Sequence, residues 1–368
     1  MTAVSSGDCW SCGTPPAGRY CGTCGVELAA HGGTWQDTVY LGPRNAALYR
    51  RAPREIRALI PVLLEPFRHL DAIAPARWRN VALTAVMGIA PLGFVSFFER
   101  VHDPIDAFRV LGLYFSALWA LFFASAFRAT GIRWRLGLGA YFGTTFVAMT
   151  LLLVSLALNV ELIRAPLVVA KNVWIAIPSA IAFIGFPEEL TKALVLFAIW
   201  RFAGPLPPLR AFLFYGLISG LGFGIKEGVH YQLGPYAAAA SRTGAFAPFY
   251  LESVLRLTSL PFFHAVWTGI AAWLIWFAAR IPSARAGLLV LAVMIPATFH
   301  GLYDALVDRS PGLALVVVGS SIVLLGIYAA SAAQFERWFG LEVDDDDGVA
   351  VPVTTAEAGS AAAVVAAR

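Results

Sequence analysis

The sequence predicts an all-α polytopic membrane protein with about eight transmembrane helices. Hydrophobic residues make up 58% of the 368-residue chain and charged residues only 14%, whereas a soluble domain carries about 25% charged residues. Several uncharged runs are long enough to cross a bilayer, which takes about 20 residues. The expected spans are 81–98, 110–127, 136–160, 172–200, 211–225, 257–279, 286–303 and 310–334.

The distribution of arginine predicts how these spans are oriented. Eight arginines lie from Arg44 to Arg79, immediately before the first span. If that segment is cytoplasmic, the inner segments together hold seventeen arginines, and the outer loops hold only seven lysines and arginines. This bias fits the positive-inside rule, so we expect both termini in the cytoplasm. The net charge is only +4, and we expect membrane lipids as partners but no nucleic acid.

The chain divides into four expected regions. Residues 1–35 form a small polar module, and residues 36–80 form a basic juxtamembrane linker. That linker is either a plain positive-inside anchor or a binding segment for the headgroups of membrane lipids. Residues 81–334 form the membrane domain, and residues 335–368 form an acidic and alanine-rich tail that we expect to be disordered.

Four cysteines in the first module predict a structural zinc ribbon. They are Cys9, Cys12, Cys21 and Cys24. Two CxxC pairs supply the tetrahedral thiolate set that Zn²⁺ prefers, and a site with four protein ligands is closed to substrate. A disulfide pair or a redox motif is the alternative, and a cytoplasmic location disfavours the disulfides. Such a ribbon is an interaction module, so we expect an unidentified cytoplasmic partner.

The span 172–200 contains three ionisable residues at apolar depth. They are Glu188, Glu189 and Lys192. Each charge at the centre of a membrane helix costs roughly 2.5–3.5 kcal/mol. Glu188 and Lys192 are four residues apart, so they share a helix face and can pair. Glu189 is rotated by about 100° from Glu188 and can therefore face a second partner.

Three further spans carry ionisable residues. They contain Glu227, His264 and the pair His300–Asp304. Asp304 lies one helical turn after His300, where it can orient the imidazole or act as a ligand itself. Taken singly, a histidine can be a hydrogen-bonded core residue and a His–Asp pair can tie two helices together. Lipid-facing placement of the whole set would cost on the order of 15 kcal/mol, so we expect the set to converge or to face water.

Residues that form one shared site must lie at the same depth in the membrane. The segment 172–200 would be ~43 Å long as a straight helix, whereas the hydrocarbon core is ~30 Å thick. Glu188 lies halfway along it, and the other ionisable residues are expected in the outer half of the bilayer. We therefore expect a break at 185–187 that raises Glu188 to the level of its partners.

The ordered set of these motifs resembles the PrsW family of intramembrane metalloproteases, which is distantly related to the CAAX prenyl endopeptidases. The likeness covers roughly residues 81–334 and leaves the zinc ribbon as an addition. The CAAX branch typically has an arginine one place after the position of Lys192 and a histidine at the position of Glu227. Lys192 and Glu227 therefore point to the PrsW branch.

The resemblance implies an intramembrane peptidase of a bacterial plasma membrane whose partner is a membrane-protein substrate, such as a single-pass regulator, which it cleaves near the outer face. Glu188 would activate a water, and Glu189 would support or orient it. Glu227, His264 and His300 would hold a catalytic divalent metal, with zinc as the first choice, or bind the oxyanion. Asp304 would orient His300, and Lys192 would set the charge of Glu188. A metal-free reaction with histidine as the oxyanion donor is the alternative.

Two functions of other classes compete with a peptidase. A proton- or ion-coupled transporter also uses Asp, Glu and His within its spans. Such transporters have duplicated halves with broken helices at matching positions, and the sequence shows no internal repeat. The other competitor is a non-catalytic membrane scaffold in which the zinc ribbon recruits a partner.

Overall fold

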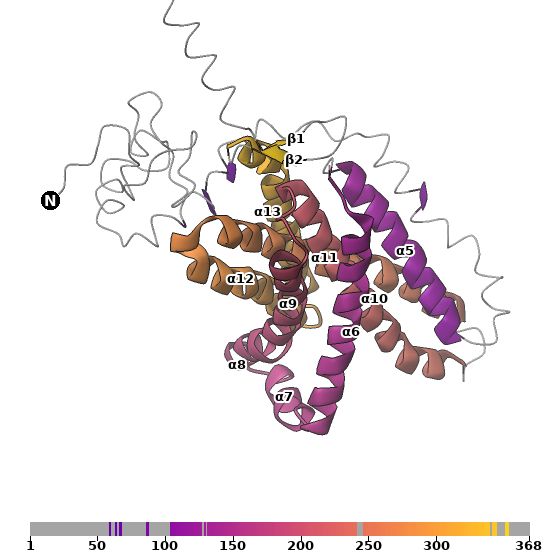
Figure 1. Ribbon diagram of the computed structural model, residues 1–368. Helices are drawn as coiled ribbons and strands as arrows, with labels where there is room; N and C mark the ends of the chain where they lie inside the picture. Colours follow the sequence, from indigo (N-terminus) through magenta and orange to yellow (C-terminus); the bar gives the residue numbers. More distant parts are fainter. Residues whose placement is uncertain are drawn as a thin grey trace, which may run out of the picture.

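Among the residues that the computed structural model describes, almost all lie in helices (Figure 1). The structure describes residues 104–126, 129, 131–240, 246–338, 341–343 and 350–352, with the isolated positions 59, 63, 64, 66, 67, 86 and 87. The elements are α5 (Pro104–Ala126), α6 (Trp134–Ala157), α7 (Glu161–Val168), α8 (Val173–Ala180), the π-helical turn η4 (Ile181–Gly185), α9 (Phe186–Phe202), α10 (Leu209–Ala240), α11 (Phe246–Arg280), the 3-10 turn η5 (Pro282–Ala284), α12 (Arg285–Leu306), α13 (Pro311–Trp338), β1 (Leu341–Val343) and β2 (Ala350–Pro352).

Six helices in the described part of the chain are long and apolar enough to cross a membrane. Their spans are Phe108–Ala126, Trp134–Ser155, Leu209–Gln232, Phe249–Arg280, Pro282–Leu306 and Pro311–Ala333. They correspond to six of the eight expected spans. The expected span 81–98 lies outside the described residues except for positions 86 and 87. The expected span 172–200 folds as α8, η4 and α9, which form one helical stretch with a π-helical turn inside it.

The helices α10 and α11 form the centre of the bundle. Their spans are 89% and 83% buried, whereas the spans of α5, α6, α12 and α13 are 24–39% buried. The surrounding helices therefore turn apolar side chains outward, as with Phe146 on α6 and Val323 on α13, which are 74% and 61% exposed. Such a surface suits lipid, because a helix that is apolar all round is stable only when buried or within a membrane.

A row of glycines lets α10 and α11 touch along their backbones. Gly216, Gly220 and Gly224 recur every fourth residue on the face of α10 that meets α11. A Cβ atom at Gly220 would lie 2.6 Å from the backbone nitrogen of Ala265. Small residues at this spacing are typical of close helix pairs in membranes. The close approach places Glu227, which follows Gly224 by three residues on α10, beside His264 on α11.

The turn η4 takes the place of the break expected at 185–187. The chain stays helical there, because Gly185 has φ −56° and ψ −52°, but the turn before Pro187 widens to a π-helix. Proline has no N–H for an α-helical hydrogen bond, and a wider turn accommodates it. Gly185 and Gly301 let this turn pack on the backbone of α12. The start of α9, which carries Glu188, is thereby held against the helix that carries His300.

The ends of the chain are described only in part. The cysteines and the linker 36–80 lie outside the described residues, apart from a few isolated positions in the linker, so the zinc ribbon stays a prediction. At the other end, α13 continues to Trp338, beyond the expected start of the tail at residue 335. It continues because Glu336 is buried and accepts hydrogen bonds from the backbone N and the Nε of Arg210, each 2.8 Å long. Further along, β1 and β2 form a short antiparallel pair.

Candidate active site within the membrane helices

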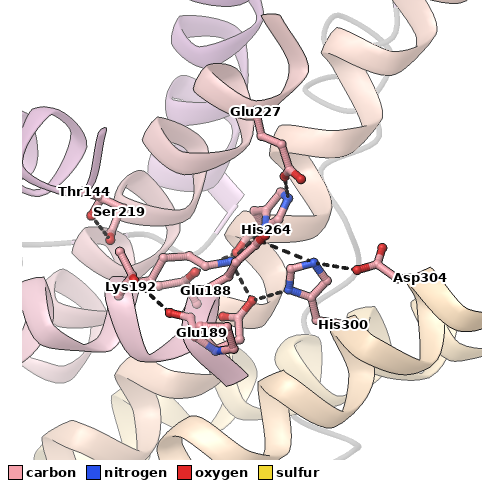
Figure 2. A network of polar contacts seen from close by, with 12 residues as sticks. Thr144, Glu188, Glu189, Lys192, Ser219, Glu227, His264, His300 and Asp304 are labelled. Atoms are coloured by element: carbon pink, nitrogen blue, oxygen red, sulfur yellow. Dashed lines mark hydrogen bonds and ion pairs between the residues drawn. The ribbon is translucent and has the colours of Figure 1, made fainter. Parts of the chain in front are cut away.

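Seven ionisable side chains from four helices gather at one place, as Figure 2 shows. They are Glu188, Glu189 and Lys192 from α9, Glu227 from α10, His264 from α11, and His300 and Asp304 from α12. These are the residues that the sequence singled out, and the structure brings all of them together. The glycine contacts of α10 and of η4 with their neighbours make this convergence possible.

Glu189 lies at the buried centre of the group. Its Oε1 atom accepts a 2.5 Å hydrogen bond from Lys192 Nζ and lies 2.9 Å from His300 Nδ1. The side chains of Glu189 and Lys192 are fully buried. Because a carboxylate only accepts hydrogen bonds, Nδ1 of His300 carries a proton, and in the neutral imidazole the lone pair is then on Nε2. Glu189 therefore sets the tautomer and the orientation of His300.

Lys192 pairs with Glu189, whereas the sequence favoured a pair with Glu188. Residues three apart share a helix face as well as residues four apart do, and in this helix Glu189 points inward. The Lys192 ammonium also lies 2.8 Å from His264 Nδ1 and 4.4 Å from the centre of the Phe223 ring. Glu188 is free of this pairing, and its side chain is 15% exposed.

His264 is held between Lys192 and Glu227. Its Nε2 atom lies 2.7 Å from Glu227 Oε2, yet the two atoms do not form a hydrogen bond. At this distance the two side chains form an ion pair whenever the imidazole carries both protons. If Lys192 donates to Nδ1, Nε2 carries the proton of the neutral imidazole. The imidazole can donate to Lys192 only when that amine is neutral, and the Nε2 lone pair is then free for an ion.

The Nε2 atom of His300 faces the remaining carboxylates. It lies 3.6 Å from Glu188 Oε2 and 3.3 Å from Asp304 Oδ2. From the sequence, we expected Asp304 to orient His300 through the other ring nitrogen. In the structure Glu189 does so, and Asp304 lies on the side of the imidazole that faces Glu188.

Trp267 also belongs to the site, although the sequence pattern did not single it out. Its ring stacks on His300 with 4.6 Å between ring centres and 20° between planes. It meets His264 edge-on at 5.5 Å. Trp267 follows His264 by three residues and therefore shares its helix face. That spacing is the one signal that could have found it, and it is weak in a helix with many aromatic residues.

Unsatisfied polar atoms concentrate in this site. Among the described residues, seven buried side-chain nitrogen or oxygen atoms have no hydrogen-bond partner, and five of them are here. The five are Glu188 Oε2, Glu189 Oε2, Glu227 Oε2, His264 Nε2 and Trp267 Nε1. Buried polar atoms in proteins are almost always satisfied. Two of the five, His264 Nε2 and Glu227 Oε2, lie 2.7 Å from each other, and the group as a whole suits a polar ligand such as water, an ion or a peptide group.

Three of the side chains have donor atoms placed to hold a metal ion. One atom each from Glu188, His264 and His300 lie within 4.8 Å of one another. One carboxylate and two imidazoles form a ligand set that zinc uses in hydrolytic enzymes. The hydrogen bond from His300 Nδ1 to Glu189 is the usual support of a metal-binding histidine. The residues fit a metal, with Glu188 in the position that we expected Glu227 to take.

Together, the membrane-type helices and the buried carboxylate–histidine set define a polytopic membrane protein with a site of hydrolytic type. Residues 132–331 match the family described as PrsW family intramembrane metalloprotease. The match covers more than half of the chain, so this chain belongs to the PrsW family, a family of intramembrane proteases. The comparisons with curated proteins and with solved structures found no match.

Proposed function

We propose that this chain hydrolyses a peptide bond of a membrane-protein substrate near the outer face of the membrane. The observation that most directly supports this proposal is the concentration of polar atoms without hydrogen-bond partners around Glu188, His264 and His300. A buried set of acceptors with no partner is costly in a structural core and useful in a catalytic site. Membership of a protease family supports the same assignment.

Glu188 is the residue best placed to activate water. Its Oε2 atom has no hydrogen-bond partner and lies 3.6 Å from His300 Nε2. Lys192 holds Glu189 and leaves Glu188 free to take a proton from water and return it to the leaving amine. General base catalysis by a positioned carboxylate contributes typically 10²–10⁴-fold.

The other ionisable residues support this reaction. Glu189 holds the imidazole of His300 with its Nε2 atom toward Glu188, and Lys192 balances the buried charge of Glu189. A divalent ion held by His264, His300 and a carboxylate would act as a Lewis acid on the scissile carbonyl. Zinc is the ion that this donor set favours. Glu188 can contact such an ion or accept a proton from a water beside it.

The exposure of the carboxylates indicates where a substrate enters. Glu188, Glu227 and Asp304 are 15%, 13% and 26% exposed, whereas Lys192 and His264 are fully buried. The substrate therefore approaches from the side of the three carboxylates. A single-pass membrane protein that unwinds locally can present a peptide bond there. The zinc ribbon would bind a separate cytoplasmic partner.

Cleavage in a defined membrane tests this function. The purified full-length protein is reconstituted in liposomes with a panel of single-pass proteins, and mass spectrometry locates any cut. We expect cleavage in the outer part of a span by the wild type and none by Glu188→Gln. A wild type that moves protons or ions across the liposome without cutting any member of the panel would support the transporter instead.

A further inference from the structure

We propose that the indole N–H of Trp267 is a further catalytic group, which binds the oxygen of the scissile carbonyl and the oxyanion that forms from it. This inference rests on the proposed peptidase function. It adds a neutral and permanent hydrogen-bond donor to a site otherwise made of carboxylates, imidazoles and one lysine.

The first observation is the unpaired state of this N–H. Trp267 is fully buried, and its Nε1 atom has no hydrogen-bond partner. Buried tryptophans normally find a partner for this group. Trp276, nine residues further along α11 and equally buried, does so by donating to the carbonyl of Pro207 at 2.9 Å. Burying the unpaired N–H of Trp267 therefore costs free energy, and the equally buried Trp276 shows that a tryptophan can pack in this helix without that cost.

The second observation is the position of the ring. Trp267 stacks on His300 and meets His264 edge-on, so the indole borders both histidines of the site. Phe263 and Tyr303 pack against the same ring at 6.3 and 6.0 Å between ring centres, which fixes its place. The N–H is thus carried by a ring that is fixed against both histidines of the site.

The third observation concerns chemistry. The unpaired carboxylate oxygens of the site are acceptors, and none of them is bonded to Nε1. The indole group only donates a hydrogen bond and does not titrate. A fixed donor among acceptors suits a carbonyl oxygen whose negative charge grows in the transition state. Removing one such donor from an oxyanion hole costs about 10²–10³-fold in kcat.

The reaction balances without further reagents. Glu188 takes a proton from water, the water oxygen bonds to the carbonyl carbon, and the π electron pair moves onto the oxygen beside Trp267. The indole keeps its proton throughout. When the carbonyl re-forms, the C–N bond breaks and Glu188 returns the proton to the amine. One peptide and one water give one carboxylic acid and one amine.

Two variants at this position test the proposal in the full-length protein. Trp267→Phe keeps an aromatic ring against His300 but lacks the N–H. Benzothienylalanine at position 267 keeps the bicyclic shape and replaces the N–H by sulfur. We expect both to lower kcat by about 10²-fold, with KM changed by less than about threefold. A phosphonamidate peptide, which mimics the oxyanion, should bind more weakly by the same factor, and the cleaved peptide product should bind as before.

The control is Trp273→Phe in the same helix. Trp273 is equally buried and stacks on Tyr328 at 4.7 Å, away from the site residues. We expect it to lose a similar amount of thermal stability with kcat unchanged. An unchanged kcat in both position-267 variants, with an active wild type, would overturn the proposal and leave the N–H with a buried water. A wild type that cleaves nothing would refute the peptidase function and this proposal with it.

Discussion

Glu189 and His300 are joined by a 2.9 Å hydrogen bond between Oε1 and Nδ1. This bond links the start of α9 to the middle of α12, two helices that also pack directly through η4. The bond gives Glu189 a structural role. It leaves Glu188, the other of the two adjacent glutamates, available for catalysis. The two carboxylates should therefore respond differently to the same substitution.

Glu188→Gln should abolish cleavage and leave the fold intact. The amide cannot take a proton from water, so we expect a loss of about 10²–10⁴-fold in kcat. Glu188 makes no pair with Lys192, so the melting temperature in detergent should stay within about 2 °C of the wild type. The matched control is Glu252→Gln, since Glu252 is 57% exposed on α11 and distant in sequence from the site residues. Retained cleavage by Glu188→Gln would assign the base to another carboxylate.

Lys192→Met should destabilise the protein, because it leaves Glu189 as a buried charge without its cation. Removing one partner of a buried ion pair costs about 3–5 kcal/mol. The double variant Glu189→Gln/Lys192→Met removes both charges and should recover part of that loss without recovering activity. Unfolding in a fixed detergent measures these two variants and the single variant Glu189→Gln. Lys171→Met, at an exposed position, is the control. Losses that simply add in the double variant would show that the two residues are not coupled.

The helices of the site and its seven ionisable residues could be predicted from the sequence. The reason is energetic, since buried charges on separate spans are tolerable only when they meet. Their pairing could not be predicted. Residues at spacings of three and four share a face, so whether Lys192 contacts Glu188 or Glu189 depends on the rotation of α9 after the π-helical turn.

Two other features of the site could not be recognised from the sequence pattern. Trp267 looks like any apolar residue in a membrane helix, and only its unpaired N–H and its stacking on His300 distinguish it. The four-residue spacing of Gly216, Gly220 and Gly224 was visible, but its meaning depends on which helix lies opposite. The partner helix, α11, is known only from the packed structure.

Gly220→Ala should separate α10 from α11 and damage both stability and activity. The new methyl group would meet the Cα and the backbone nitrogen of Ala265 at 2.6 Å, and a backbone cannot rotate away as a side chain can. Overpacking of this kind costs typically 1–3 kcal/mol. The displacement would also move His264 from Glu227, so cleavage should fall further than the stability change explains. Unfolding and initial rates on the same preparations check both effects.

Gly319→Ala provides the matched control for this glycine row. Gly319 lies on the exposed face of α13, and a Cβ atom added there would have no neighbour within 4 Å. Alanine is the better helix former by about 1 kcal/mol, so this variant should be neutral or slightly stabilised. Equal losses at positions 220 and 319 would mean that the row on α10 has no special packing role.

Metal analysis of the purified full-length protein separates the two predicted metal sites. We expect about two equivalents of zinc, one from the cysteine module and one from the membrane site, since each site offers a complete donor set. Replacing Cys12 and Cys24 by serine should remove about one equivalent and leave peptidase activity in place. His264→Ala/His300→Ala should remove the other equivalent together with activity. His230→Ala, at an exposed position on α10, should change neither. A cysteine variant that is free of metal and still cleaves would show that Glu188, His264 and His300 act on the substrate without an ion.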